Sequence, residues 1–219
     1  QLLLKNMVFD GQDPLLSCDG KSLLNLYTIK EIPEFVTGVE GKALRTDGYS
    51  TWMDTTTEGD VSSLSGWFAL ESYPTDTAAF MGIRDMAGTS VAVCVDRYGE
   101  LLLGMGQNGS YSYCSLKTKV DRFKWLHVVL DLSNESFAEW TEDECRGMAP
   151  ELQDGEMMFR VGKDFREKKV WMYDVTAING LIDGISLTPF PMIRLHGETD
   201  CLRIEEDSGF GYSGNPFCE

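Results

Sequence analysis

Short apolar runs that alternate with turn residues dominate the middle third of the chain, and this spacing constrains the fold most strongly. Runs of this length are typical of β-strands. Gly or Asn-Gly between them predicts tight turns, because both residues tolerate positive φ. Turn signals of this kind occur at residues 86–88, 97–99 and 108–109. The pattern predicts a meander of antiparallel strands at residues 65–72, 77–83, 90–96, 100–106, 110–116 and 124–132.

Helical periodicity is weak. Residues 22–32 fit a turn or two of helix, and residues 133–148 fit a short acidic helix. Prolines are scattered, so no interior linker is indicated, whereas residues 205–219 are rich in Gly and Ser and have no apolar period. We therefore predict an all-β jelly-roll sandwich of two antiparallel sheets with minimal helix at residues 1–204, followed by a connector at 205–219.

The charge balance is strongly acidic, with a net charge of −16 and an isoelectric point near 4.5. Such a field repels phosphate backbones and anionic lipids, which argues against nucleic-acid and membrane-surface partners. No apolar run approaches the roughly 20 residues of a membrane span. The opening nine residues are too short and polar for a signal peptide, so both a cytoplasmic protein and a secreted one whose signal lies elsewhere stay open.

Motifs for catalysis and for zinc binding are missing. There is no phosphate-binding glycine loop, no nucleophile elbow and no paired Cys-x-x-Cys. The acidic runs at 142–144 and 205–207 are contiguous, so they cannot line one strand face as glucanase carboxylates do. His127 lies in a strand-like run and is predicted to pack rather than to catalyse. Most of the six cysteines are predicted to be small buried apolar side chains.

Aromatic side chains are the more informative group, because sugar rings bind by stacking on Trp or Tyr. Tyr111 and Tyr113 lie two apart in one predicted strand and therefore share a face. Tyr49 and Trp52 lie in a turn-rich segment, and Trp140 lies in a polar insertion. These five residues are the candidate ligand contacts. Their alternative role is burial in the core of the sandwich.

A calcium site is the remaining candidate, because carboxylates in loops are the ligands that calcium prefers. Asp10, Asp13 and Asp19 lie close together near the N-terminus. Their spacing does not fit an EF-hand, and local Asx-turns are the alternative. No cofactor is required by the sequence; a structural calcium ion is the one that these residues would suit.

Three motifs, in order, resemble laminin-G-like and concanavalin A-like lectin domains. They are "VTGVEGKALRTDGYS" at 36–50, "FKWLHVVLDLS" at 123–133 and "VWMYDVTAINGLIDGISL" at 170–187. The third begins with a strand-like run that closes on Asn179-Gly180. By period, Asp183 shares a face with Leu181 and Ile185, where burial without a partner is costly. In the resemblance Asp183 is the acidic position of the closing strand, where we expect it to accept backbone hydrogen bonds or to hold calcium with Asp19.

A narrower resemblance is to the lectin-like module of bacterial glycoside hydrolases of family 32. Residues 193–219 of this chain are similar to the strand and connector that join that module to the propeller domain of those enzymes. Fragments at 83–86 and 143–147 resemble catalytic signatures of that family, but the residues expected next do not follow. The nucleophile motif of the family is also missing, so the resemblance implies that this chain is not the catalytic domain.

The leading hypothesis is accordingly a non-catalytic carbohydrate-recognition or structural accessory module of a bacterial glycoside hydrolase. The module would be secreted, periplasmic or on the cell surface, with a catalytic neighbour in the same chain and a poly- or oligosaccharide ligand. The alternative is a laminin-G or pentraxin-like interaction domain that binds a protein or a calcium-bridged ligand. A sandwich-fold glycosidase is disfavoured.

Overall fold

The computed structural model describes residues 2–3, 25–30, 33–39, 42–58, 61, 63–131, 152–171 and 173–188. Several predictions concern residues outside these ranges. They are Trp140, the calcium candidates Asp10, Asp13 and Asp19, the acidic helix at 133–148 and the connector at 205–219.

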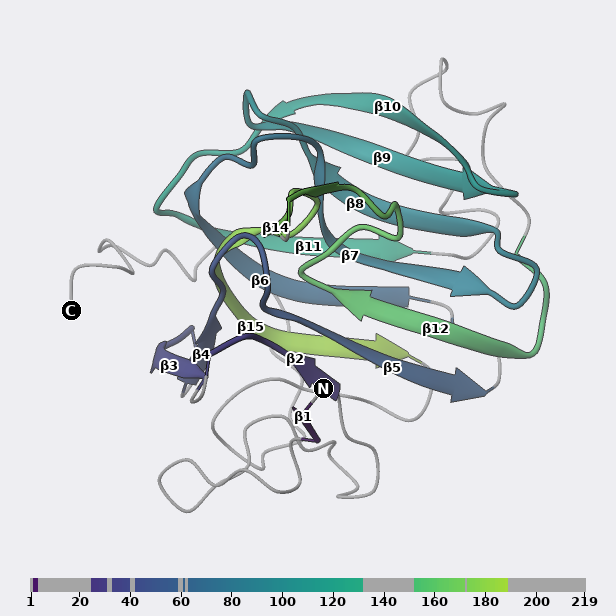
Figure 1. Cartoon of the computed structure of the whole chain (residues 1–219), viewed down its shortest axis with the longest axis horizontal. Coiled ribbons are helices and arrows are strands. Elements are labelled where there is room, and N and C mark those ends of the chain that lie inside the picture. The colour runs from purple at the N-terminus through teal and green to yellow at the C-terminus, as the bar shows by residue number, and fades with distance from the viewer. Residues whose placement is uncertain are drawn as a thin grey trace.

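Every regular element of the described residues is a β-strand, and the strands form two facing antiparallel sheets (Figure 1). The large sheet has the order β1 (Leu2–Leu3), β2 (Asn25–Tyr27), β5 (Trp52–Glu58), β12 (Glu156–Val161), β7 (Ala78–Asp85), β8 (Ser90–Val95), β9 (Glu100–Gln107) and β10 (Ser110–Lys119). The small sheet has the order β11 (Trp125–Asp131), β6 (Ser63–Ser72), β15 (Asn179–Thr188), β4 (Lys42–Arg45) and β3 (Glu34–Thr37). A separate hairpin consists of β13 (Lys169–Val170) and β14 (Tyr173–Asp174). The predicted all-β jelly-roll sandwich is confirmed.

All six strands predicted in the middle third are present, and the turns between β7, β8, β9 and β10 lie where they were expected. Gly88 and Gly99 have φ of 87° and 85°, and Asn108-Gly109 has the two positive φ values of a type I′ turn. The meander is right for these four strands and wrong for β6 and β11, which pair with each other in the small sheet. Alternation tells which side of a strand is buried, but it does not tell which sheet receives the strand.

Residues 22–32 do not form the predicted helix in their described part. Asn25–Tyr27 is strand β2, which pairs with β5 so that Leu26 lies opposite Met53. Leu26 is fully buried between the sheets. A short apolar run fits both the helical period of 3.6 and the strand period of 2, and here the pairing with β5 makes the run a strand.

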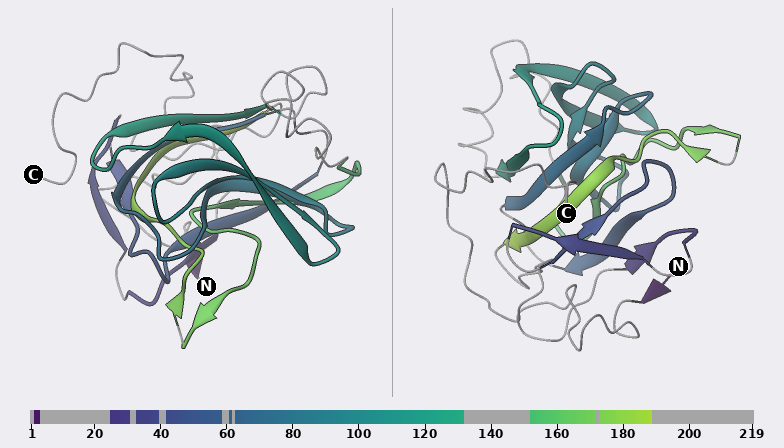
Figure 2. Two further views of the ribbon diagram at one scale, coloured as in Figure 1. Left: turned by 90° about the horizontal axis from the view of Figure 1, so that it is seen from above. Right: turned by 90° about the vertical axis from the view of Figure 1, so that its left-hand side faces the viewer.

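The hydrophobic core lies between the two sheets, whose stacking is visible in Figure 2. Phe68 of β6 and Phe80 of β7 meet across it with ring centroids 5.0 Å apart. Burial of such a side chain contributes about 1.5–3 kcal/mol. Fully buried large residues of this core include Phe68, Phe80, Phe159, Leu26, Leu44, Met53, Leu64 and Leu70.

Strand β15 contains a bulge that changes the expected facing of its side chains. The pairing with β6 shifts between Asp183 and Ser186, and Gly184 there has a φ of 58°. Leu181 packs with Ala69 on the outer side of the small sheet, whereas Ile185 lies in the core between the sheets. The prediction that Asp183 shares its face with Ile185 is therefore wrong, because the extra residue of the bulge turns Ile185 inward. Asn179-Gly180 also belongs to β15 and does not close a preceding strand.

Candidate functional site

Five of the connections at one end of the sandwich together form what we call the loop end (Figures 1 and 2). They are residues 46–51, 73–77, 96–99, 120–124 and 162–178. Backbone hydrogen bonds join neighbouring connections. The N–H of Asp174 donates to the carbonyl of Tyr49 (3.3 Å), and the N–H of Val120 donates to that of Gly99 (2.7 Å). The loop end is therefore one continuous surface made by segments distant in sequence.

Residues 162–178 form the largest of these connections, and a buried ion pair closes its base. Lys163 Nζ lies 2.8 Å from Asp174 Oδ2, and the two residues are only 3% and 5% exposed. Asp174 Oδ1 also accepts hydrogen bonds from the N–H and the hydroxyl of Thr176. A buried pair with its remaining lone pairs satisfied in this way holds the two chain segments in one arrangement.

Phe165 anchors the same connection to the outer face of the large sheet. Its side chain is 2% exposed and lies over Gly82, where a Cβ would clash with the ring. The guanidinium groups of Arg84 and Arg160 lie 5.3 and 5.1 Å from the ring centroid. Cations at this distance from a ring face are attracted by its quadrupole. The missing side chain of Gly82 therefore makes the seat for Phe165.

Trp52 is part of this packing. Its ring stacks on Tyr27 of β2 at 4.0 Å, and Arg160 of β12 lies 4.6 Å from its centroid. Burial lowers the pKa of Arg160 below its ordinary value, against the attraction of Asp54. Since β2 and β12 flank β5, Trp52 is engaged from both sides by side chains of the chain itself.

Tyr111 and Tyr113 share the outer face of β10, as their spacing predicts, and both reach toward the 162–178 connection. The hydroxyl of Tyr111 donates to the carbonyl oxygen of Phe165 (3.2 Å), and that of Tyr113 donates to Asp164 Oδ2 (2.5 Å). Burial and the charge of Asp164 raise the pKa of Tyr113 well above its ordinary value. Burial also raises the pKa of Asp164. In this structure both tyrosines tie the connection to the sheet.

Asp76 supplies a further anchor from the 73–77 loop. It forms ion pairs with Arg166 (3.2 Å) and Lys168. Burial would raise its pKa, but hydrogen bonds from Lys168, the backbone of Thr77 and Arg166 outweigh burial and lower the pKa of Asp76 to about 2. The carboxylate therefore stays charged at neutral pH and holds the outer part of the connection.

Beyond these anchors, the β13–β14 hairpin projects from the sandwich (Figure 2). It carries the exposed aromatic residues Trp171 and Tyr173. Trp171 is 93% exposed and has a φ of 62°, a backbone conformation that is uncommon for a bulky residue. The ring of Tyr173 meets that of Tyr49 edge-on at 5.0 Å. We call Tyr49, Val170, Trp171 and Tyr173 the aromatic platform. An exposed Trp in a strained conformation, on a hairpin anchored at its base, is typical of a functional element.

The predicted site residues thus lie in different places. Tyr49 belongs to the aromatic platform, where its ring meets that of Tyr173. Trp52, Tyr111 and Tyr113 lie on the outer face of the large sheet, in contact with the 162–178 connection. Trp171 and Tyr173 were missed, because "KKVWMYD" has the pattern of an ordinary half-buried strand and nothing in it signals that the run leaves both sheets.

Asp183 is buried and therefore does not offer its carboxylate to a ligand in solvent. It is 0% exposed, and its Oδ1 accepts a hydrogen bond from the N–H of Gly184 (2.8 Å). A Cβ at Gly38 would clash with the carboxylate, so the glycine leaves the space that the carboxylate fills. The predicted partner for calcium, Asp19, lies outside the described residues. Among those that the structure describes, no group of three or more His, Cys, Asp or Glu side chains could hold a metal ion.

We expect Asp183→Ala to lower the free energy of unfolding by about 1–3 kcal/mol, because it removes the acceptor of the partly buried N–H of Gly184 and opens a void beside Gly38. Urea denaturation followed by intrinsic fluorescence measures the change. Asp154→Ala, at an exposed position between two sheet strands, is the matched control and should change stability little. Equal stability of the Asp183 variant and the wild type would contradict the prediction.

Neither a known family profile nor a curated protein matches the chain. In the described part, no helix is long and apolar enough to cross a membrane.

Among solved structures, the chain is similar to tailspike protein 2 from Escherichia coli O157:H7 bacteriophage CAB120, with 10% identity, 81% of this chain covered and a TM-score of 0.47. It spans only 28% of the length of that tailspike. It is also similar to the heptameric SAP-like pentraxin from Limulus polyphemus, with 10% identity, 75% of this chain and 74% of the pentraxin covered, and a TM-score of 0.39. Likenesses at this level identify no family, so the functional argument rests on the loop end itself.

Proposed function

We propose that the chain is a non-catalytic carbohydrate-recognition module and that the aromatic platform is its sugar-binding surface. The observation that carries the proposal is Trp171, which is 93% exposed on a hairpin whose base is held by a buried ion pair. The C–H faces of sugar rings stack on exposed Trp and Tyr rings. Because the hairpin is already ordered by its anchors, little conformational entropy is lost on binding.

Polar groups around the platform suit sugar hydroxyls. Lys169 is exposed beside Trp171, and Ser50 follows Tyr49 in the 46–51 loop. Of the other exposed large apolar side chains among the described residues, Met86 and Tyr98 lie on separate turns, whereas the N–H of Ile29 donates to the hydroxyl of Ser50. A projecting platform forms a shallow and wet site, so we expect weak affinity for a single sugar and tighter binding to polymers.

The non-catalytic part of the proposal is supported by the carboxylates on the outer face of the large sheet. Asp54 accepts hydrogen bonds from Asn25 (3.1 Å) and Tyr27 (3.3 Å). Asp164 is bound by Tyr113, and Asp174 by Lys163. Each carboxylate is occupied by the chain's own side chains. Glycosidases instead direct two carboxyl groups at the substrate.

The wider setting is also a proposal. A recognition module of this kind would act next to a catalytic domain, and a bacterial glycoside hydrolase of family 32 is the setting that the sequence motifs suggest. Cys114 is disulfide-bonded, whereas Cys94 is a buried free thiol. Disulfides persist in oxidising compartments, which supports a secreted or cell-surface protein.

Trp171→Ala tests the platform. We expect it to weaken saccharide binding by about tenfold or more, as truncation of a central aromatic contact commonly does. Isothermal titration against fructans, xylans, β-glucans and acidic polysaccharides measures the loss. Tyr98→Ala removes another exposed aromatic ring, on the β8–β9 turn, and should leave binding unchanged.

Two results would overturn the proposal. One is that no saccharide binds the wild-type chain. The other is that Trp171→Ala and Tyr98→Ala bind as the wild type does, which would place any sugar site away from the platform.

A further inference from the structure

The distribution of charge at the loop end is unlike that of the rest of the chain. Its five connections contain seven of the 19 Lys and Arg residues and seven of the 35 Asp and Glu residues. Their formal charges cancel, so the net charge of −16 arises entirely from the other residues. The loop end is therefore formally neutral, so its own formal charges do not repel an anion.

The acidic residues of the loop end are, in addition, engaged within the protein. Asp47 accepts hydrogen bonds from the backbone N–H groups of Tyr49, Ser50 and Thr51. The remaining six also have partners. Asp76 pairs with Lys168 and Arg166, Asp121 with Lys124, and Glu167 with Lys163. Asp96 accepts from the backbone N–H groups of Tyr98 and Glu100, Asp164 from Tyr113, and Asp174 from Lys163 and Thr176. Each carboxylate thus has at least one donor, which reduces its repulsion of a bound anion.

Lys169 differs from the other cations of the hairpin. Lys163 and Lys168 are ion-paired, but Lys169 is exposed and its ammonium group has no hydrogen bond or ion pair within the part of the chain that the structure describes. It lies on β13, directly before Val170 and two residues from Trp171. Its backbone pairs with that of Asp174 in β14, and the N–H of Asp174 donates to the carbonyl of Tyr49. The aromatic platform is therefore accompanied by a positive charge that the protein does not itself neutralise.

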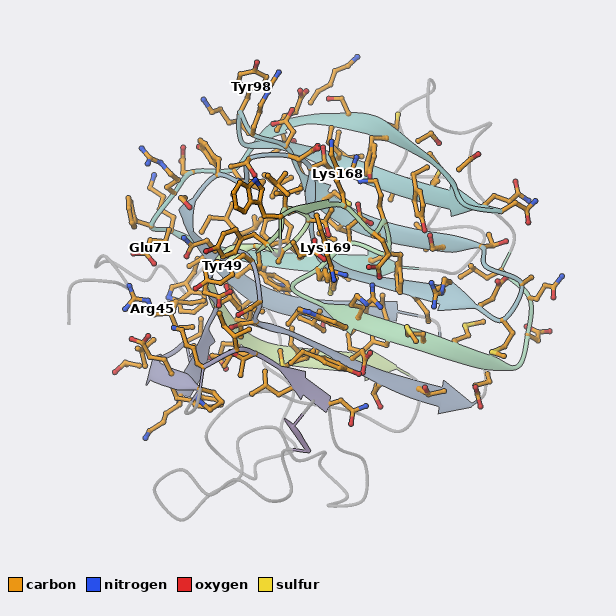
Figure 3. All side chains as sticks on the ribbon, in the orientation of Figure 1. Arg45, Tyr49, Glu71, Tyr98, Lys168 and Lys169 are labelled. Carbon is orange, nitrogen blue, oxygen red and sulfur yellow. The ribbon has the colours of Figure 1, made fainter. Side chains whose placement is uncertain are left out.

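We infer that the aromatic platform recognises an acidic saccharide, one that carries carboxylate or sulfate groups. The rings of Trp171 and Tyr173 stack on the sugar, and Lys169 pairs with its anionic group. This inference rests on the carbohydrate-recognition function proposed above and narrows its ligand. Arg97 provides an internal comparison, because it lies over Tyr98 and likewise has no carboxylate partner among the described residues. Tyr98 lies well apart from Lys169 and Tyr49 in Figure 3.

The experiment compares polygalacturonate and heparin with the neutral polymers dextran and inulin, by isothermal titration at low and at physiological salt. We expect the acidic polymers to bind more tightly than the neutral ones, and salt to weaken that binding. Lys169→Gln should weaken it by about two- to fivefold, as expected for an exposed charge pair. Arg97→Gln makes the same change in net charge and should leave the affinity nearly unchanged.

Each outcome is decisive. Neutral polymers that bind equally well, with loss in Trp171→Ala but not in Lys169→Gln, would overturn this inference and leave the proposed function standing. Acidic polymers that bind without dependence on Trp171, or that are weakened equally by Arg97→Gln and Lys169→Gln, would show diffuse ion exchange and also overturn it. If neither class of polymer binds, both proposals fail.

Discussion

Asp174→Ala is expected to lower the free energy of unfolding by about 3–5 kcal/mol, the usual cost of removing one member of a buried ion pair. The substitution leaves the ammonium group of Lys163, which is 3% exposed, with only the more distant Glu167 at 3.4 Å. It also removes the acceptor of Thr176 at the base of the 162–178 connection. Urea denaturation monitored by circular dichroism measures the change.

Two comparisons make this result specific. Asp121→Ala breaks an exposed ion pair with Lys124 at the same end of the sandwich and should cost less than about 1 kcal/mol. The double variant Lys163→Met, Asp174→Leu replaces both charges by apolar groups and should recover most of the lost stability. Equal effects of Asp121→Ala and Asp174→Ala would show that burial of the Lys163–Asp174 pair has no energetic consequence.

Phe165→Ala is expected to lower the free energy of unfolding by about 3–5 kcal/mol as well, because it leaves a cavity that the surrounding sheet cannot close. The cavity would lie on Gly82, between the guanidinium groups of Arg84 and Arg160, which would lose the ring that they contact. The same denaturation experiment measures the effect.

The expected result also includes binding. Phe165 packs on Gly82 and Arg160 and so holds the connection that carries Trp171 on the large sheet. Saccharide affinity should therefore fall in Phe165→Ala even under conditions where the protein is fully folded. Tyr98→Ala, an exposed aromatic truncation, should stay within about 0.5 kcal/mol of the wild type. Unchanged stability in Phe165→Ala would show that the outer face does not depend on this ring.

Local signals in the sequence predicted much of the fold because they act over a few residues. Asn108-Gly109 turns where two positive φ values are needed, and strands β7 to β10 coincide with the short apolar runs between turn signals that predicted them. The shared face of Tyr111 and Tyr113 follows from the same period of two. The function of that face does not follow, because the hydroxyls of both tyrosines bind a segment about 50 residues away in sequence.

The sequence by itself determined that this chain is an all-β sandwich, where most strands of its middle third begin and end, and which of their side chains alternate. These properties depend on backbone sterics and on the period of the strand. Tertiary structure alone decided that β6 and β11 leave the meander, that the bulge at Gly184 turns Ile185 inward, and that "KKVWMYD" projects as a hairpin instead of joining a sheet. Contacts of Phe165, of Asp76 and of the Lys163–Asp174 pair anchor the connection that carries the exposed Trp171. Contacts between segments that are distant in sequence produce no local pattern of apolar and polar residues, so the sequence does not reveal them.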